Sequence, residues 1–156
     1  VSLSNLSRAV FSGGNDGSSP YNINVMSYVN PSSTGNATDF GDLLNPQYGG
    51  GGVNGDTRGI ITGGYSSSDS TWLVNTLQHF SFASTGNATD FGDLLFKTGE
   101  ADATNKSTRG VIAGGNSPSW STINQIQYIT IASTGNATDF GDLTDATSNL
   151  AMCSGD

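Results

Sequence analysis

Acidic residues recur in pairs at three places in this 156-residue chain. Each pair encloses a phenylalanine and a glycine, and the pairs are Asp39 with Asp42, Asp90 with Asp93, and Asp139 with Asp142. Neighbouring carboxylates can bind calcium, but calcium takes about six to eight oxygen ligands, and two carboxylates supply only a start. A pair in a polar turn also lacks the apolar pocket that raises a carboxyl pKa for acid catalysis. We therefore retain these aspartates as calcium candidates that need further ligands, and we expect no catalytic role and no resident cofactor.

The arginines occupy one repeated position. Each precedes a small residue, two apolar residues, another small residue and a glycine pair, and the three are Arg8, Arg58 and Arg109. A guanidinium group matches the geometry of a carboxylate, and Asp side chains also cap their own turns. We expect the arginines to pair with aspartates of a neighbouring strand, as part of the scaffold.

The single histidine, His79, stands where the other repeats have Tyr28 and Tyr128. It is therefore expected to fill a tyrosine position rather than to act as a base. Serine is abundant, but no Gly-x-Ser-x-Gly pattern accompanies it. The glycine-rich segment 48–53 lacks the Lys-Ser or Lys-Thr of a phosphate-binding loop. A hydrolase is the weaker alternative, since it would need an acid and a base in variable loops that contain no histidine.

Function is expected where the repeats differ, in three loops that follow the glycine pairs, at 15–23, 65–74 and 116–123. Each loop contains an aromatic residue three or four positions before the aligned asparagine, and two loops contain an acid; the candidate ligand-binding residues are Tyr21, Trp72, Trp120, Asp16 and Asp69. Aromatic rings among hydroxyl and amide groups suit a saccharide or a protein epitope. The alternative is that each ring covers the neighbouring repeat. Segment 95–107, with Lys97 and Glu100, is expected to be a solvated loop.

An eleven-residue motif, Ser-Thr-Gly-Asn-Ala-Thr-Asp-Phe-Gly-Asp-Leu, occurs unchanged at 33–43, 84–94 and 133–143. A period of roughly 50 residues indicates stacked supersecondary units. Each unit is predicted to contain four short strands, exemplified by 48–55, Arg58–Thr62, Asn124–Ile131 and the Thr-Asp-Phe-Gly-Asp-Leu segment, with Thr-Gly-Asn-Ala as a tight turn. No stretch has helical periodicity over three turns.

Four antiparallel strands in each unit are typical of a β-propeller blade. The sequence therefore predicts an all-β fold with three four-stranded blades in a single repeat domain, residues 1–156. The approximate repeats are 1–47, 48–98 and 99–147, and segment 148–156 is predicted to be a strand of the next blade or of a partner's blade.

The glycine pair, the Tyr28 and Tyr128 positions and the aromatic of the fourth strand resemble the kelch repeat. The sequence of the eleven-residue motif, with the following Thr-Arg-Gly and Gly-Gly, is similar to the repeats of marine bacteriophage proteins that are described as virion or tail-fibre proteins. The resemblance implies an extracellular virion component that is not an enzyme. Its function would be structural or adhesive, with host-surface or glycan recognition through the loops, or purely architectural.

Charge and composition narrow the range of partners. The chain has five basic and thirteen acidic residues, a formal net charge of −8. This balance argues against nucleic acid and anionic membranes as partners. The one cysteine, Cys153, excludes an internal disulfide and a cysteine-based zinc site.

Three blades are too few to close a ring, and closure removes exposed strand edges. Two chains could form a six-bladed ring, in which the C-terminal segment of one chain completes the first blade of the other. A three-blade excerpt of a longer chain and a stack that is not a propeller are the alternatives. We expect a homo-oligomer or association with other virion proteins.

Overall fold

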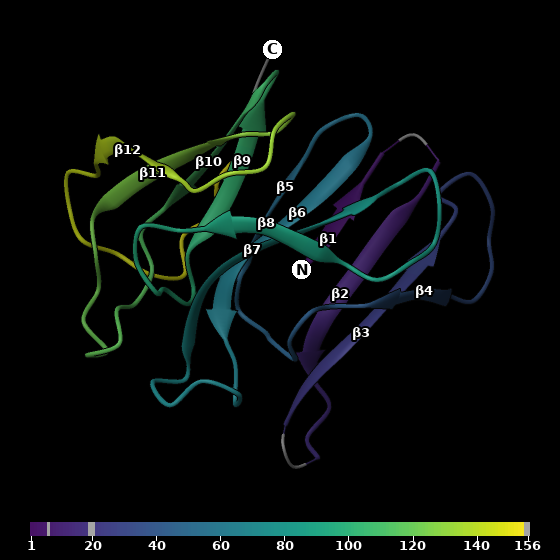
Figure 1. Cartoon of the computed structure of the whole chain (residues 1–156), viewed down its shortest axis with the longest axis horizontal. Helices are drawn as coiled ribbons and strands as arrows, with labels where there is room; N and C mark the ends of the chain where they lie inside the picture. The colour runs from purple at the N-terminus through teal and green to yellow at the C-terminus, as the bar shows by residue number, and fades with distance from the viewer. Residues whose placement is uncertain (6, 19–20, 155–156) are drawn as a thin grey trace.

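The computed structural model describes residues 1–5, 7–18 and 21–154. In these ranges the chain contains twelve strands and no helix. The described residues therefore include no helix with the length and apolar character needed to cross a membrane. The strands form three four-stranded antiparallel sheets, which fan out side by side in Figure 1. The predicted all-β class with three four-stranded blades is confirmed.

Each sheet is built from four consecutive strands, and we call the sheets blades 1, 2 and 3. Blade 1 contains β1 (Ser2–Ser4), β2 (Ala9–Asn15), β3 (Asn22–Val29) and β4 (Thr38–Asp42). Blade 2 contains β5 (Gly51–Asn54), β6 (Arg58–Tyr65), β7 (Leu73–Ser81) and β8 (Thr89–Asp93). Blade 3 contains β9 (Asp102–Lys106), β10 (Arg109–Ala113), β11 (Gln125–Thr130) and β12 (Thr138–Asp142).

The strands follow one another in spatial order within each blade, from β1 to β4, β5 to β8 and β9 to β12. The first strands of the three blades are neighbours, because β5 contacts both β1 and β9. The fourth strands lie at the outer edges. This is the arrangement of propeller blades around a common axis.

The second strand was predicted to end at the glycine pair, and in blades 1 and 2 it continues beyond it. In blade 2, β6 runs on to Tyr65, with a break in register between Thr62 and Gly64. A glycine pair in a strand permits such a bulge, since the extra residue needs an unusual backbone conformation. The extension places Tyr65 at the base of the variable loop.

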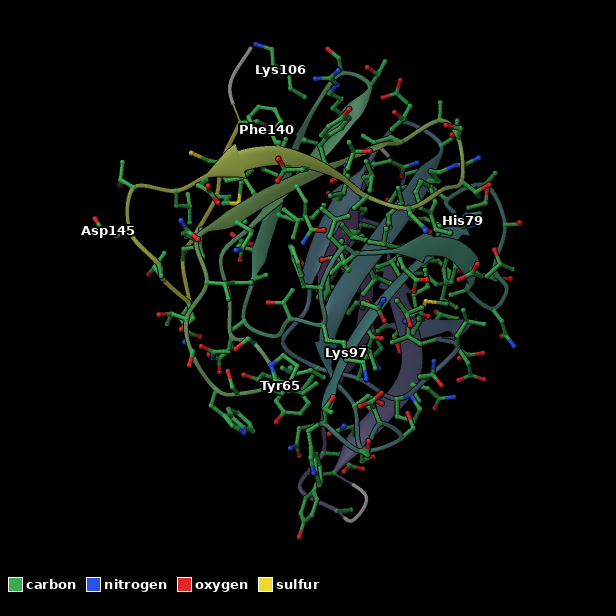
Figure 2. The ribbon with its side chains drawn as sticks, turned by 60° about the vertical axis from the view of Figure 1, so that its left-hand side comes forward. Tyr65, His79, Lys97, Lys106, Phe140 and Asp145 are labelled. Carbon is green, nitrogen blue, oxygen red and sulfur yellow. The ribbon has the colours of Figure 1, made fainter. Side chains whose placement is uncertain are left out.

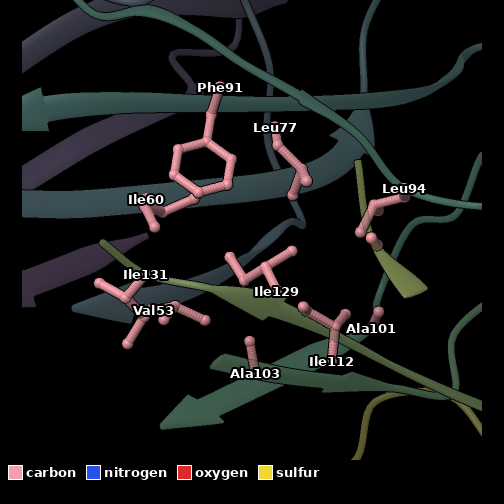
Figure 3. Packing of buried hydrophobic residues seen from close by; sticks show 11 residues of the cluster. Val53, Ile60, Leu77, Phe91, Leu94, Ala101, Ala103, Ile112, Ile129 and Ile131 are labelled. Carbon is pink, nitrogen blue, oxygen red and sulfur yellow. The ribbon is translucent and has the colours of Figure 1, made fainter. Parts of the chain in front are cut away.

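Packing between blades forms two apolar layers. The first contains Leu3, Val10, Met26, Phe40 and Leu43 of blade 1 and Ile61, Phe80, Phe82 and Ala88 of blade 2. The second, shown in Figure 3, contains Val53, Ile60, Leu77, Phe91 and Leu94 of blade 2 and Ala101, Ala103, Ile112, Ile129, Ile131 and Ala137 of blade 3. Successive residues of a strand point to opposite faces, so Ile60 packs toward blade 3 and Ile61 toward blade 1.

The eleven-residue motif joins one blade to the next. The Gly86 amide donates to the Phe40 carbonyl at 2.7 Å, and the Ala88 amide donates to the Asp42 carbonyl at 2.8 Å. The Asp42 amide in turn donates to Oδ1 of Asn87 at 3.0 Å. We call this three-bond contact the turn clip. It caps the outer edge of β4 with the turn of blade 2.

The same clip joins blade 2 to blade 3, where Gly135, Asn136 and Ala137 take the same roles on β8. A Cβ at Gly41 or Gly92 would collide with the carbonyl oxygen of Gly86 or Gly135, respectively. Both glycines also have positive φ, of 142° and 144°. Within the described chain the copy at 84–94 both gives and receives a clip, the copy at 33–43 receives one, and the copy at 133–143 gives one.

The predicted arginine–aspartate pairs do not form. The Arg8 guanidinium lies 5.0 Å from the centre of the Tyr28 ring and donates to the Phe82 carbonyl at 2.8 Å. Arg109 lies over the Tyr128 ring in the same way, at 4.5 Å. The third strand separates the arginine's strand from the fourth strand, which carries the aspartates, so the tyrosine is the nearer partner.

Residues 148–154, predicted to be a strand, form none within the single chain. Among the described residues no fourth sheet follows blade 3 for this segment to join. In blade 1, the position beside β2 is occupied by β1, with Leu3 opposite Val10. The start of the segment nevertheless follows the pattern of the preceding blades. The Asn149 amide donates to the Glu100 carbonyl, just as the Glu100 amide donates to the Gly49 carbonyl. Residues 155 and 156 of the predicted strand lie outside the described residues.

Candidate functional site

The three variable loops lie at one end of the sheets, where β2, β6 and β10 end (Figure 1). The aromatic residue of each loop has the same backbone conformation, with φ of 72° at Tyr21, 60° at Trp72 and 62° at Trp120. In each case its amide donates to the carbonyl of the residue three positions earlier. Positive φ is unfavourable for bulky side chains, and such conformations gather at functional sites.

The shared turn holds the rings outward. The exposed fractions are 50% for Tyr21, 49% for Trp72 and 65% for Trp120. The sequence allowed two roles for these aromatics, ligand binding or covering the neighbouring repeat, and both apply to Trp120. Its ring covers part of blade 2 and still presents most of its surface to solvent. Tyr21 and Trp72 have no stacked ring among the residues that the structure describes.

Three rings form a continuous stack across the boundary between blades 2 and 3. Trp120 lies on Tyr65 with centroids 5.7 Å apart and planes at 17°, and Tyr65 lies on Tyr48 at 5.1 Å and 29°. Tyr65 is buried in the middle, whereas Tyr48 and Trp120 are exposed at the ends. The stack fixes the orientation of the Trp120 indole and leaves its outer face open.

Polar groups lie beside Tyr65, the buried middle ring of this stack. The Asn116 side-chain amide donates to Oε2 of Glu100 at 2.6 Å and to the Tyr65 hydroxyl at 3.3 Å. Asn149 donates to the same Glu100 oxygen at 2.8 Å. Burial raises the pKa of the Tyr65 hydroxyl, and the Glu100 carboxylate raises it further. At neutral pH the site thus offers a neutral phenol, a carboxylate and two oriented amides.

The two predicted acidic candidates serve their own loops. The Asp69 carboxylate accepts from Lys97 Nζ at 2.6 Å and from the Thr71 amide at 2.8 Å. These bonds lower the pKa of Asp69 to about 2. Asp16 accepts from the Ser18 amide at 2.8 Å. Asp69 keeps its charge at neutral pH and holds Lys97 beside the loop.

Sequence reasoning missed the supporting residues of the site. Lys97 and Glu100 were expected in a solvated loop, but they contact the variable loops of blades 2 and 3. Tyr65 and Asn116 follow their glycine pairs directly, and this equivalent position was the available signal. No sequence feature marked Tyr48 as part of the site, because its stacking partner Tyr65 is distant in the sequence and lies in strand β6.

His79 lies elsewhere in the molecule from Tyr65 (Figure 2). It lines a cavity of about 300 Å³ with Arg58, Thr85 and Asn87, and its Nε2 is 3.1 Å from the Thr89 hydroxyl. Burial lowers the pKa of His79, and the Arg58 charge adds to this. Tyr28 and Tyr128 line similar, smaller cavities in the other blades. His79 therefore occupies the tyrosine position, as its place in the repeat predicts.

The calcium candidates carry no additional acidic ligands. In the part of the chain that the structure describes, no group of three or more His, Cys, Asp or Glu side chains is arranged to hold a metal ion. The backbone of Asp42 and Asp93 is used in the turn clips.

Comparison with protein families and with curated sequences gives no match. The structure is similar to solved structures, among them that of YjhT, with a TM-score of 0.76 and 12% sequence identity. The match covers 94% of this chain and 52% of YjhT, a propeller-type protein, so this chain spans about half of the neighbour's length. This chain has a propeller-like fold. At such low identity the likeness concerns the fold alone.

Proposed function

We propose that this chain is a non-enzymatic binding protein whose propeller-like scaffold presents its variable loops to a saccharide. The observation that carries the proposal is the stack of Trp120, Tyr65 and Tyr48, with the outer face of Trp120 open to solvent. A sugar ring would pack its C–H face on the indole. Hydroxyl groups at its edge would bond to Glu100 and to the neighbouring amides.

Charge favours a neutral saccharide. The chain has a net charge of −8, and Glu100 contributes a carboxylate at the site itself. An acidic sugar would meet repulsion there, whereas hydroxyl groups can donate to the carboxylate. Trp72 and Tyr21, in the same conformation on the other loops, would provide further contacts for an extended or branched glycan.

The kelch-like character of the repeats and a place in a phage particle are part of this proposal, and they rest on the resemblance of the repeat motifs. In that setting the protein is an extracellular virion component that attaches to a host surface. The alternative is a purely architectural subunit without a ligand. Buried loop aromatics would favour that alternative, and the exposure of all three rings favours adhesion.

An enzyme is supported less well by the arrangement of acids and bases. Asp69 has a pKa of about 2, so it is a poor general acid at neutral pH. His79 lies away from the loop face that carries Tyr65 (Figure 2).

The proposal is tested with a glycan array, followed by solution titration of the best glycan using tryptophan fluorescence. Trp120→Ala should weaken binding at least tenfold, whereas Trp120→Phe should retain part of it. Phe140→Ala is the matched control, because Phe140 is also an exposed aromatic but lies away from Tyr65 (Figure 2). Absence of any glycan ligand, or equal weakening by Phe140→Ala at concentrations where the unchanged chain is a monomer, would refute the proposal.

A further inference from the structure

The stack of blades ends in two open faces. The open face of blade 3 contains Val111, Ile126, Tyr128, Phe140 and Leu143. The open face of blade 1 contains Phe11, Ser27, Val29, Pro31 and Ala37. Each face is apolar in its centre and is covered by no residue that the structure describes.

The junctions within the chain show what covers such faces. Phe140 is 54% exposed, whereas its equivalents Phe40 and Phe91 are 2% exposed, each beneath the following blade. On the other side, Phe11 is 47% exposed, whereas its equivalents Ile61 and Ile112 are fully buried against the preceding blade. Figure 2 shows Phe140 at the outside of the molecule, and its ring meets the Tyr128 ring of the same blade with centroids 6.1 Å apart. The two open faces are thus the two halves of one junction.

The turn clip is also present in two separate halves. Blade 1 carries Gly35, Asn36 and Ala37, identical to the residues that make the clips of blades 2 and 3. Blade 3 offers Phe140, Gly141 and Asp142, identical to the residues that receive them. Gly141 has open space, whereas its clipped equivalents Gly41 and Gly92 face a neighbouring carbonyl.

We propose that blade 1 of a second copy of this chain docks on the open face of blade 3. The contact is head to tail, so two copies with two such junctions close a six-bladed ring and leave no open face. The length comparison fits a ring of about twice this chain's length, because one copy matches about half of the propeller-type protein YjhT. The matching clip halves and blade faces of this chain point to a second copy as the occupant. The ring uses blade faces and turn clips, and it does not require exchange of the segment 148–154.

The junction between copies lacks a polar side chain that both internal junctions bury. Within the chain, Gln78 accepts a hydrogen bond from the Leu44 amide at 2.8 Å, and Gln127 accepts one from the Leu95 amide at 2.9 Å. Blade 1 has the shorter Ser27 at this position. The junction between copies therefore lacks one hydrogen bond and is weaker than the internal junctions, so the ring should dissociate on dilution.

Sedimentation velocity and light scattering over a dilution series, from about 1 mM to 10 nM, test the proposal on the full chain. The expected species at high concentration has twice the chain mass of 16.0 kDa. Phe140→Asp and Phe11→Asp change opposite faces, and each should raise the dissociation constant at least tenfold. Gly141→Ala should do the same by blocking the clip. Phe96→Asp, at an exposed apolar residue outside both faces, is the control and should leave the constant unchanged.

Separate changes on the two open faces distinguish a weakened junction from a misfolded chain. Circular dichroism of each variant under dilute conditions should match that of the unchanged chain, because both phenylalanines are exposed in the single chain. A wild-type chain that stays at 16.0 kDa throughout the series would overturn the proposal and favour further blades of a longer chain as the occupant. A dimer that is disrupted by Phe140→Asp but not by Phe11→Asp would contradict the head-to-tail contact and indicate pairing between two copies of blade 3.

Discussion

The packing between blades makes a quantitative prediction at one repeated phenylalanine. Phe91 is buried between blades 2 and 3, where its ring meets the edge of His79 at 5.6 Å, and it belongs to the second apolar layer. Phe91→Ala removes the ring and leaves a cavity, which costs about 3–5 kcal/mol at buried phenylalanines. Phe140→Ala changes the equivalent residue, which is 54% exposed and lies on an open face. It should cost about 1 kcal/mol, because roughly half of the ring is already in water and no closed cavity forms.

The assay is urea unfolding followed by circular dichroism and tryptophan fluorescence, at concentrations where sedimentation shows a monomer. A domain typically has a stability of about 5–15 kcal/mol, so a loss of 3–5 kcal/mol is readily measured. Phe40→Ala, in the first layer, should behave like Phe91→Ala. Equal losses for Phe91→Ala and Phe140→Ala in the monomer would refute the assignment of Phe140 to an open face. At concentrations that favour the dimer, Phe140→Ala should become more costly, because the second copy then covers the ring.

Three further predictions concern buried or charged side chains. Gln78→Leu removes the acceptor of the Leu44 amide and leaves buried polar groups unpaired, so urea unfolding should show a loss of about 3 kcal/mol. The pKa of Asp69 falls from its usual 3.8 to about 2 on folding, so the unfolded chain binds more protons in this window. Stability should therefore be lost as the pH falls from about 4 toward 2, and Asp69→Asn should flatten that part of the pH profile. The pKa of His79 is also lowered, so stability should decline as the pH drops below its usual value of 6.5. His79→Tyr should abolish that decline in thermal melts at several pH values, and an unchanged profile would contradict the assignment.

The repeats made the fold predictable, because three copies of one motif defined the unit and its strands. The eleven-residue motif also indicated which turn residues matter. Its role in joining blades could not be predicted, because the clip depends on contacts between Gly86 and Phe40, which lie in different blades. The arginine partners were wrong for the same reason, since carboxylate pairing is the simplest assumption until the strand order shows that Tyr28 is closer to Arg8.

The candidate site was predicted in part. Differences among the repeats pointed to the loops and to Trp120, because residues that do not maintain the scaffold are free to vary. The ring beneath it, Tyr65, belongs to a strand that continues past the glycine pair, and a bulge of this kind has no clear sequence pattern. Its partner Glu100 precedes the first strand of blade 3, and Asn149 follows the last strand of that blade, so only the fold brings these two residues together.

The division of labour within each repeat follows from these contacts. At the two internal junctions, the Gly-Asn-Ala turn and the Phe-Gly-Asp-Leu end of the repeated motif form the turn clips and parts of the apolar layers, so a change there affects two blades at once. The turns that end at Trp72 and Trp120 are closed by backbone hydrogen bonds within their own loops. Such loops can change their side chains without disturbing the junctions. Because the turn clips and the exposed turns use different residues, substitutions in the turns can change the exposed surface while the blades keep the same packing.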